Sequence, residues 1–504
     1  MRNLFPTLCA VIWAAIILGA CSGSGSQNPI NNSPNPSSPM APSFSGGGGS
    51  GGGGYPDTFY ENYGNNEFVS TEDETSSTFG MDVDTASYTI VRKYLNDGNM
   101  PEPDSVRTEE FVNYFDHPYA EPQGDDIFSI SIEGAGSHFG APDYHLLKIG
   151  IKSEAMQVHE RQPANIVFVI DTSGSMGSGN RLELVKDAIH ILSNGLQEGD
   201  KIGLVEYGSY GSIISGLTPD ISFILNSVDA LNADGSTNAE EGLKLAYDVA
   251  REGFEANKIN RVILCSDGVA NVGVTGPDAI LEAIKTDADK GITLTTLGFG
   301  MGNYNDILLE QLANDGDGNY FYIDTITEAE RLFSEGALRI LVTLGFDAKV
   351  QVNFNPAAVD MFRLIGYENR LLDEEDFEDN TVDSGDIGPN QAVTALYEVM
   401  MNPEADSGST AATVKVRCTL PDGETIEQYE NTIDVNGVLQ SFDNASRDFR
   451  FTASVVEFAE ILKESPFAED GTFQEILSVA GGIAVDDDQA EFIELVNKAI
   501  ELSD

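Results

Sequence analysis

Residues 165–177 read NIVFVIDTSGSMG, an apolar run that ends in an aspartate and continues into two serines on either side of a glycine. The first six residues have the length and composition of a strand that is buried on both faces. Asp171, Ser173 and Ser175 follow directly, where such a strand leaves the core. One carboxylate and two hydroxyls in this position indicate a binding loop, and Gly174 allows a turn tight enough to bring both serines to one point.

Strand-like and helix-like segments alternate from about residue 163 to residue 340. The apolar runs expected to form buried strands are NIVFVI (165–170), KIGLVEY (201–207), RVILCS (261–266) and ITLTTLGFG (292–300). Residues 181–196, 239–250 and 278–288 place apolar side chains at helical spacing, and the apolar face of the first consists of Leu182, Val185, Ala188, Ile189 and Leu192. This alternation predicts an α/β fold with a doubly wound, mostly parallel sheet covered by helices on both faces.

Two further loops repeat the chemistry of the first. Thr237 lies in DGSTN (234–238), just before a predicted helix, and Asp267 follows a predicted strand in CSDG (265–268). Because ligand sites of such sheets lie beyond the carboxyl ends of the strands, we expect the loops to converge. The candidate metal ligands are Asp171, Ser173, Ser175, Thr237 and Asp267. Their oxygen atoms suit Mg²⁺, Mn²⁺ or Ca²⁺, and since only two of these side chains are charged, the ion would still attract an anionic sixth ligand.

Each loop also has an interpretation without a metal. The stretch from Asp171 to Ser175 could cap a helix, and so could Ser236 or Thr237, because such side chains satisfy free amide donors. Residues 266–268 could form an ordinary turn. We prefer the metal site because all three loops occur at predicted strand ends.

The segments on both sides of the α/β region look like strands. They are 128–134 and 145–154 before it, and 348–354, 361–367, 392–401, 412–420 and 424–435 after it. We therefore expect the α/β domain to be inserted into one β-sandwich built from both flanks, which requires residues 127–151 to share a sheet with residues 347–434. The last part of the chain shows helical spacing in 451–462, 473–480 and 489–502.

The length and the net charge of the chain limit the classes of function that it can have. The 504 residues are enough for two or three domains, and 27 Lys plus Arg against 82 Asp plus Glu give a net charge of −55. This charge excludes nucleic acid as an expected partner, because phosphate binding needs basic surface. An acidic surface is commonly no more than a solvated surface, but it also attracts divalent cations.

The first residues, MRNLFPTLCAVIWAAIILGACSGSGS, place one arginine before an apolar run that is short for a membrane span. We interpret residues 1–20 as a signal peptide. Leu18 to Cys21 resembles the lipobox of bacterial lipoproteins, which implies that Cys21 is lipidated and holds the protein on a membrane surface. Ser22 then favours the outer membrane. The alternative is an ordinary secretory signal with a chance cysteine.

Two composition features follow the predicted signal. Residues 21–54 are rich in Gly, Ser and Pro and predict a flexible tether. Of the four cysteines, Cys9 would leave with the signal and Cys21 would carry lipid. Cys265 and Cys418 lie far apart in strand-like runs, and we predict that they are buried free thiols.

The three loops together resemble the metal-ion-dependent adhesion site of von Willebrand factor type A (VWA) domains. All five positions of that site are intact here. The resemblance implies direct metal bonds from Ser173, Ser175 and usually Thr237, with Asp171 and Asp267 acting mainly through water. It also implies that the open position takes a Glu or Asp from a protein partner.

The resemblance extends over nearly the whole chain after the tether. Residues 77–115, 260–273, 296–306, 318–324 and 362–370 are similar to a family of bacterial lipoproteins with a central VWA domain. The resemblance implies a family-specific N-terminal region (55–160), the VWA domain (161–342), a β-rich C-terminal region (343–440) and a helical region (441–504).

Other candidate sites are weaker. Asp82 and Asp84 form a carboxylate pair that could bind a cation, but we prefer to interpret them as caps of a helix beginning near Thr85. Residues 314–320 begin like a calcium loop but lack glycine at the sixth position and glutamate at the twelfth, which favours a turn. The acidic loop 373–379 could reach the metal site as an internal ligand.

We expect a non-enzymatic, metal-dependent binding protein in a bacterial cell envelope. It would be lipid-anchored, with a Mg²⁺ (or Mn²⁺ or Ca²⁺) that captures an acidic residue of a protein partner. One alternative is an assembly or chaperone-like subunit of an envelope complex. Another is a metal-dependent hydrolase, although the sequence shows no second catalytic cluster.

Overall fold

The computed structural model describes residues 58, 60–139, 143–268, 277–301, 305–333 and 337–503, without the side chains of 277–280. The predicted signal peptide, the tether and Cys21 lie outside these residues. Residues Gly52–Asp504 cluster as one unit, to which everything below refers. Within the described residues, no helix has the length and apolar character that crossing a membrane requires.

A six-stranded sheet forms the centre of the predicted α/β domain, with the strand order β10-β9-β8-β5-β6-β7. All neighbouring strands are parallel except β6 and β7. The strands are β5 (Ala164–Asp171), β6 (Lys201–Tyr207), β7 (Gly211–Thr218), β8 (Ile259–Ser266), β9 (Thr293–Phe299) and β10 (Tyr320–Ile323). This confirms the prediction of a mostly parallel sheet.

Helices cover both faces of this sheet. They are α3 (Arg181–Ser193), α4 (Ile221–Asp229), α5 (Ala239–Glu252), α6 (Pro277–Ala288), α7 (Asp306–Asn314) and α8 (Ile326–Phe333). Successive side chains of a strand point to opposite faces. Ile166 and Phe168 of β5 accordingly join the core under α3, whereas Val167 joins the core under α5. The predicted apolar face of α3 is buried in the first of these cores.

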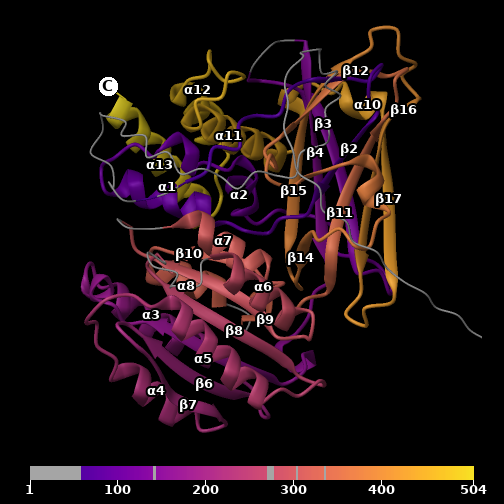
Figure 1. The fold of residues 1–504 in the computed structure, drawn as a ribbon. Coiled ribbons are helices and arrows are strands. Elements are labelled where there is room, and N and C mark those ends of the chain that lie inside the picture. The colour runs from indigo at the N-terminus through magenta and orange to yellow at the C-terminus, as the bar shows by residue number, and fades with distance from the viewer. Residues whose placement is uncertain are drawn as a thin grey trace, which may run out of the picture. The chain divides into compact units, whose positions relative to one another are not determined.

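Two antiparallel sheets form the sandwich, and their inner faces share one apolar core (Figure 1). The first has the order β1-β12-β15-β4-β3, with β1 (Val69–Ser70), β3 (Phe128–Gly136), β4 (Tyr144–Ser153), β12 (Val359–Ile365) and β15 (Ala392–Met401). The second has the order β13-β2-β11-β16-β17, with β2 (Ser76–Gly80), β11 (Gly345–Phe354), β13 (Leu371–Leu372), β16 (Thr410–Thr419) and β17 (Ile426–Asp434); β14 (Gly385–Ile387) pairs with β11.

Both sheets combine strands from before and after the α/β domain. β4 pairs with β15 from Tyr144 opposite Met400 to Lys152 opposite Ala392, and β2 pairs with β11. The α/β domain therefore enters the chain between β4 and β11 as an insertion into one sandwich, as predicted. Cys265 and Cys418 are buried and free, which confirms that prediction as well.

Helices from both ends of the chain share a third core. They are α1 (Ala86–Asn96), α2 (Thr108–Asn113), α11 (Arg447–Leu462), α12 (Phe473–Ala480) and α13 (Asp487–Ser503); two short helices, α9 (Leu338–Leu341) and α10 (Val435–Val438), lie elsewhere. Aromatic rings dominate this core, with Phe115 edge-on to Phe451 and to Phe492. The opposite side of α1 packs on the α/β domain through Ile90 and Tyr94.

The prediction that Asp82 and Asp84 cap a helix is wrong. Helix α1 begins at Ala86 without a side-chain cap from Thr85, and the Glu110 carboxylate instead accepts a hydrogen bond from the Ser87 amide at 2.7 Å. Asp82 is paired with Arg370 at 3.1 Å. The carboxylate of Asp84 accepts from the amide of Tyr320 at 3.0 Å. Buried carboxylates need charged or amide partners, and folding supplies these from distant segments.

The predicted turn at residues 314–320 is confirmed. Helix α7 ends at Asn314, Asp317 has a φ of 46° in the left-handed region, and β10 begins at Tyr320. Among the described residues, no group of three or more His, Cys, Asp or Glu side chains is arranged to hold a metal ion.

Candidate metal centre

Asp171 is the last residue of β5 and is fully buried. One carboxylate oxygen accepts a hydrogen bond from the Ser173 amide at 2.8 Å, and the other accepts from the Ser266 hydroxyl at 3.1 Å. Burial raises the pKa of Asp171 to about 6. Its two donors hold the carboxylate in a fixed orientation at the carboxyl edge of the sheet.

The predicted ligands of the first and third loops lie within hydrogen-bond distance of one another. The hydroxyl oxygens of Ser173 and Ser175 are 3.0 Å apart. The Ser175 hydroxyl donates to a carboxylate oxygen of Asp267 at 3.1 Å. Two segments separated by about ninety residues thus meet at one point, as the parallel topology predicts.

The second loop joins the first through its backbone. The Gly174 amide donates to the Gly235 carbonyl at 3.0 Å, and the Asp234 amide donates to the Thr172 carbonyl at 2.8 Å. Gly235 has a φ of 83°, which glycine adopts without strain. Thr237 follows two residues later, and the structure therefore brings its loop against the first loop.

The two helix-cap interpretations of these loops do not fit the structure. Helix α3 begins only at Arg181, after Asn180, so the stretch from Asp171 to Ser175 does not cap it. The cap of α5 is Asn238, whose side chain accepts from the amide of Glu241. Thr237 is consequently not the cap.

Sequence reasoning missed Arg181, the first residue of α3. Its guanidinium donates to the carboxylate of Asp267 at 2.5 Å, to the Ser175 carbonyl at 3.3 Å and to the Met301 carbonyl. Gly300 provides the space, because a Cβ there would lie 2.2 Å from Arg181 Nε. Burial raises the pKa of Asp267, while Ser175 and Arg181 act in the opposite direction. The only signal in the sequence is a glycine-rich stretch after the strand that ends at Phe299.

The donor set fits a hard divalent cation. Three hydroxyls and two carboxylates present oxygen atoms, and one of these carboxylates is partly neutralised by Arg181. Such a site would leave a bound cation short of negative charge, and an additional acidic ligand from outside would supply it. Ser173 and Ser175 bond to each other, Ser175 also bonds to the carboxylate of Asp267, and among the described residues no histidine makes a hydrogen bond to either serine.

The rim of the site carries an exposed aromatic ring. Tyr210, in the turn between β6 and β7, is 81% exposed. The neighbouring Ser209 hydroxyl accepts from the Ser236 amide at 3.0 Å, which ties this turn to the second loop. The acidic loop 373–379 lies elsewhere, because its carbonyls accept hydrogen bonds from the sandwich residues Lys349, Gln351 and Arg417.

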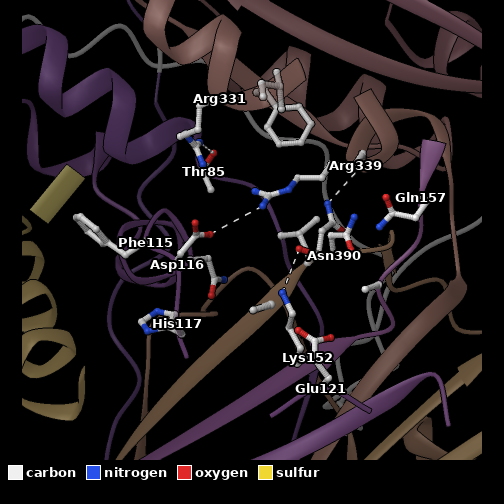
Figure 2. A pocket seen from close by; sticks show the side chains of 17 residues that line it. Thr85, Phe115, Asp116, His117, Glu121, Lys152, Gln157, Arg331, Arg339 and Asn390 are labelled. Carbon is white, nitrogen blue, oxygen red and sulfur yellow. Dashed lines mark hydrogen bonds and ion pairs between the residues drawn. The ribbon is translucent and has the colours of Figure 1, made fainter. Parts of the chain in front are cut away.

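A separate cavity of about 380 Å³ lies where α8, the segment after α2 and the start of β15 meet (Figure 2). None of the predicted metal ligands lines it. Its cations have partners: Arg331 pairs with Glu328 at 2.6 Å, Arg339 lies 3.9 Å from Asp116, and Lys152 donates to the Asn390 carbonyl at 3.3 Å. Figure 2 shows Arg339 directed toward Asp116. The cavity is polar but internally balanced.

Comparison with known proteins defines the class. Residues 165–335 match the family described as von Willebrand factor type A domain, and residues 55–148 match a family described as von Willebrand factor. The chain is therefore a VWA-domain protein. Such domains generally mediate protein–protein interactions rather than catalysis.

The flanks identify the family more closely. Residues 339–502 match the C-terminal family of the uncharacterized protein YfbK. The YfbK protein of Escherichia coli K12 is 34% identical over 477 residues, which cover 88% of this chain and 81% of that protein. The chain belongs to the YfbK family, and the predicted central VWA domain with its two family-specific flanks is confirmed.

Other similar proteins either match only part of the chain or have a low TM-score and a low sequence identity. The uncharacterized protein sll0103 of Synechocystis is 31% identical over 199 residues, covering 39% of this chain and 46% of that protein. Among solved structures, a von Willebrand factor type A protein from Catenulispora acidiphila has a TM-score of 0.41 and 16% identity, covering 75% of this chain and 87% of that one.

Proposed function

We propose that this protein is a metal-dependent protein-binding lipoprotein of the bacterial cell envelope. Asp171, Ser173, Ser175, Thr237 and Asp267 would hold Mg²⁺, or alternatively Mn²⁺ or Ca²⁺, and the ion would bind a Glu or Asp side chain of a partner protein. The observation that carries the proposal is the meeting of three loops at the carboxyl edge of the sheet, with Ser173, Ser175 and Asp267 in one hydrogen-bonded chain.

The surroundings of the site support a protein partner. An exposed tyrosine beside a metal-bound acidic residue is suited to an interface, since aromatic side chains contribute much of the binding energy at interface centres. Tyr210 would pack beside the captured carboxylate. The strongly acidic chain would repel an acidic partner at long range, so the bound cation is what makes the contact favourable.

Capture from envelope extracts tests this function. The immobilised protein should retain a partner in Mg²⁺ and release it in EDTA, and Thr237→Ala should abolish retention. Thr286→Ala, the same change at an exposed position on α6, is the matched control and should retain the partner. Partner retention in EDTA, or equal loss in both variants, would contradict the proposal.

A second experiment tests whether the metal binds a carboxylate of the partner. Treating the extract with a carbodiimide and a neutral amine converts exposed carboxylates to amides. Retention of the partner should then be lost while the immobilised protein is unchanged. Undiminished retention would show that the metal does not bind an acidic side chain of the partner.

The lipid anchor is a separate part of the proposal and rests on the sequence around Cys21. Wild-type protein should incorporate a labelled fatty acid and sediment with membranes. Cys21→Ser should do neither and should be exported in soluble form. Membrane association of Cys21→Ser equal to that of wild type would contradict lipid anchoring.

A further inference from the structure

The amino-terminal edge of the six-stranded sheet borders a cavity of about 630 Å³, a volume within the range of small-molecule sites. The first residues of β8 and β9 line it, together with residues 156–162 and 341–344, the two segments that connect the VWA domain to the sandwich. Phe346 of β11 contributes from the sandwich. The cavity therefore lies at the opposite edge from the metal centre.

The charge of this cavity is opposite to that of the chain. Its charged lining residues are Arg161, Lys258, Arg261, Lys290 and Glu160, four cations with one acid, whereas the chain has 82 acidic and 27 basic residues. Three of these cations have carboxylate partners: Arg161 with Asp200 at 2.6 Å, Lys258 with Glu255 at 2.9 Å, and Lys290 with Asp287 at 3.5 Å.

Arg261 is the exception. Arg261 is only 3% exposed. One of its guanidinium nitrogens donates to the Thr295 hydroxyl at 2.8 Å, and its Nε is buried with no hydrogen-bond partner. Within the described part of the chain, every other arginine of comparable burial has a carboxylate within ion-pair distance; these are Arg92, Arg107, Arg161 and Arg363. Burial lowers the pKa of Arg261 to about 10.

An unpaired buried cation is costly, because several kcal/mol of hydration are lost without a compensating interaction. Asp386 is the main alternative source of a counter-charge, since it is one of the acids that interact with Arg261. However, burial and the charges of Asp317 and Asp347 raise the pKa of Asp386 well above its usual range. Neither Asp386 nor Asp317, the other acid whose charge acts on Arg261, forms an ion pair with it in the described part of the chain, so its guanidinium can still take an anion from outside.

The other side of the cavity is apolar. Phe254 is a large hydrophobic residue that is 40% exposed at this point, and Leu344 and Phe346 are partly exposed beside it. A guanidinium binds a carboxylate through two parallel hydrogen bonds, and a single negative charge matches a single unpaired cation. We propose that this cavity binds a small organic carboxylate, with its head group on Arg261 and its apolar body against Phe254, Leu344 and Phe346.

The cavity in Figure 2 does not carry the same inference, because its three cations are already engaged by Glu328, Asp116 and the Asn390 carbonyl. The carboxylate site is also independent of the metal centre, since the two lie at opposite edges of one sheet. Failure of one assignment therefore leaves the other intact.

Isothermal titration of the full chain with octanoate tests the proposal. Octanoate should bind with a stoichiometry of one. Octylamine has the same tail and the opposite charge, and acetate lacks the tail. Both should bind at least about tenfold more weakly than octanoate. Octanoate should bind Thr237→Ala as it binds wild type, which separates this site from the metal centre. Absence of saturable octanoate binding, or equal binding of octylamine, would overturn the proposal.

Arg261→Gln should weaken octanoate binding at least about tenfold. A second pair of variants decides the question if this variant does not fold. Lys290→Glu, at the exposed rim of the cavity, should weaken octanoate binding, whereas Lys244→Glu, the same change on the exposed face of α5, should not. Equal affinity in folded Arg261→Gln and wild type, or in the two lysine variants, would refute the site.

Discussion

At the carboxyl edge of the six-stranded sheet, the hydroxyls of Ser173 and Ser175 contact each other and the carboxylate of Asp267, and the cation that contacts this group, Arg181, is paired with Asp267. At the amino edge, four cations line a cavity, and Arg261 is unpaired. The group at the carboxyl edge is rich in oxygen ligands, whereas the amino edge holds one buried cation without a carboxylate partner. The comparison teaches that the two edges of one sheet can carry side chains of opposite charge, because the loops at its two edges come from different parts of each βα unit.

Asp171→Ala should have the largest effect on the carboxyl edge. We expect Mg²⁺ affinity to fall at least about 100-fold, or roughly 3 kcal/mol, because one of two carboxylates is removed and the anchor of the Ser173 amide is lost. Titration calorimetry measures this. Asp229→Ala, which removes an exposed carboxylate of the same domain, should bind Mg²⁺ as wild type does. An equal loss of Mg²⁺ affinity in both variants would mean that the net charge of the protein, and not this site, controls Mg²⁺ binding.

Asp317→Asn tests the electrostatics near the amino edge. Burial and the charges of Asp383 and Asp347 raise the pKa of Asp317 to about 6, so the folded state binds this proton more tightly than the unfolded state. Stability from this group is complete below pH about 4 and is lost as the pH rises through 6. The neutral amide should therefore stabilise the protein by about 1–2 kcal/mol at pH 8, and by almost nothing at pH 4.

Urea unfolding at both pH values measures the effect of Asp317→Asn. Asparagine tolerates the positive φ of this position, so backbone strain is not added. Asp187→Asn, at an exposed position of α3, should show no comparable gain at pH 8. A gain that is the same at both pH values would exclude the raised pKa as its cause.

Arg181→Gln should have a smaller effect with an unexpected sign. Removing the cation leaves Asp267 with its full negative charge, so Mg²⁺ should bind about threefold more tightly, or by less than 1 kcal/mol. Arg251→Gln, an equal charge change on α5, should leave Mg²⁺ affinity unchanged because its charge is remote and screened. Weaker Mg²⁺ binding by Arg181→Gln would show that its positioning of Asp267 outweighs its charge.

Arg261→Gln should have the smallest effect on the metal centre. Strand β8 has eight residues at about 3.3 Å each, which separates its ends by more than twice the screening length in physiological salt. Mg²⁺ affinity should stay within about a factor of two of wild type. A larger change would mean that the two edges are coupled.

The α/β domain was predictable from the sequence because each of its strands and helices has a recognisable pattern within a short stretch of residues. Each strand is a short apolar run, each helix has its own apolar face, and parallel pairing then brings the residues after Ile170 and Cys265 to one edge. The five candidate ligands could be selected for the same reason. Their metal binding stays a prediction.

The charged contacts were not predictable, because each joins residues without a common pattern. Arg370 pairs with Asp82 across 288 positions, and a carboxylate pair before a helix looks the same whether it caps that helix or binds a distant arginine. Arg181 was missed because its contact with Asp267 depends on the space left by Gly300. The sandwich could be proposed from strand-like flanks, but its registers depend on long-range pairing.

Crystals grown with Mn²⁺ and measured near the manganese absorption edge test the central claim most directly. The account predicts one strong anomalous peak within coordination distance of the Ser173, Ser175 and Thr237 hydroxyls, and no such peak in Asp171→Ala crystals. Saturating Mn²⁺ with no peak at these three side chains in wild-type crystals would contradict it.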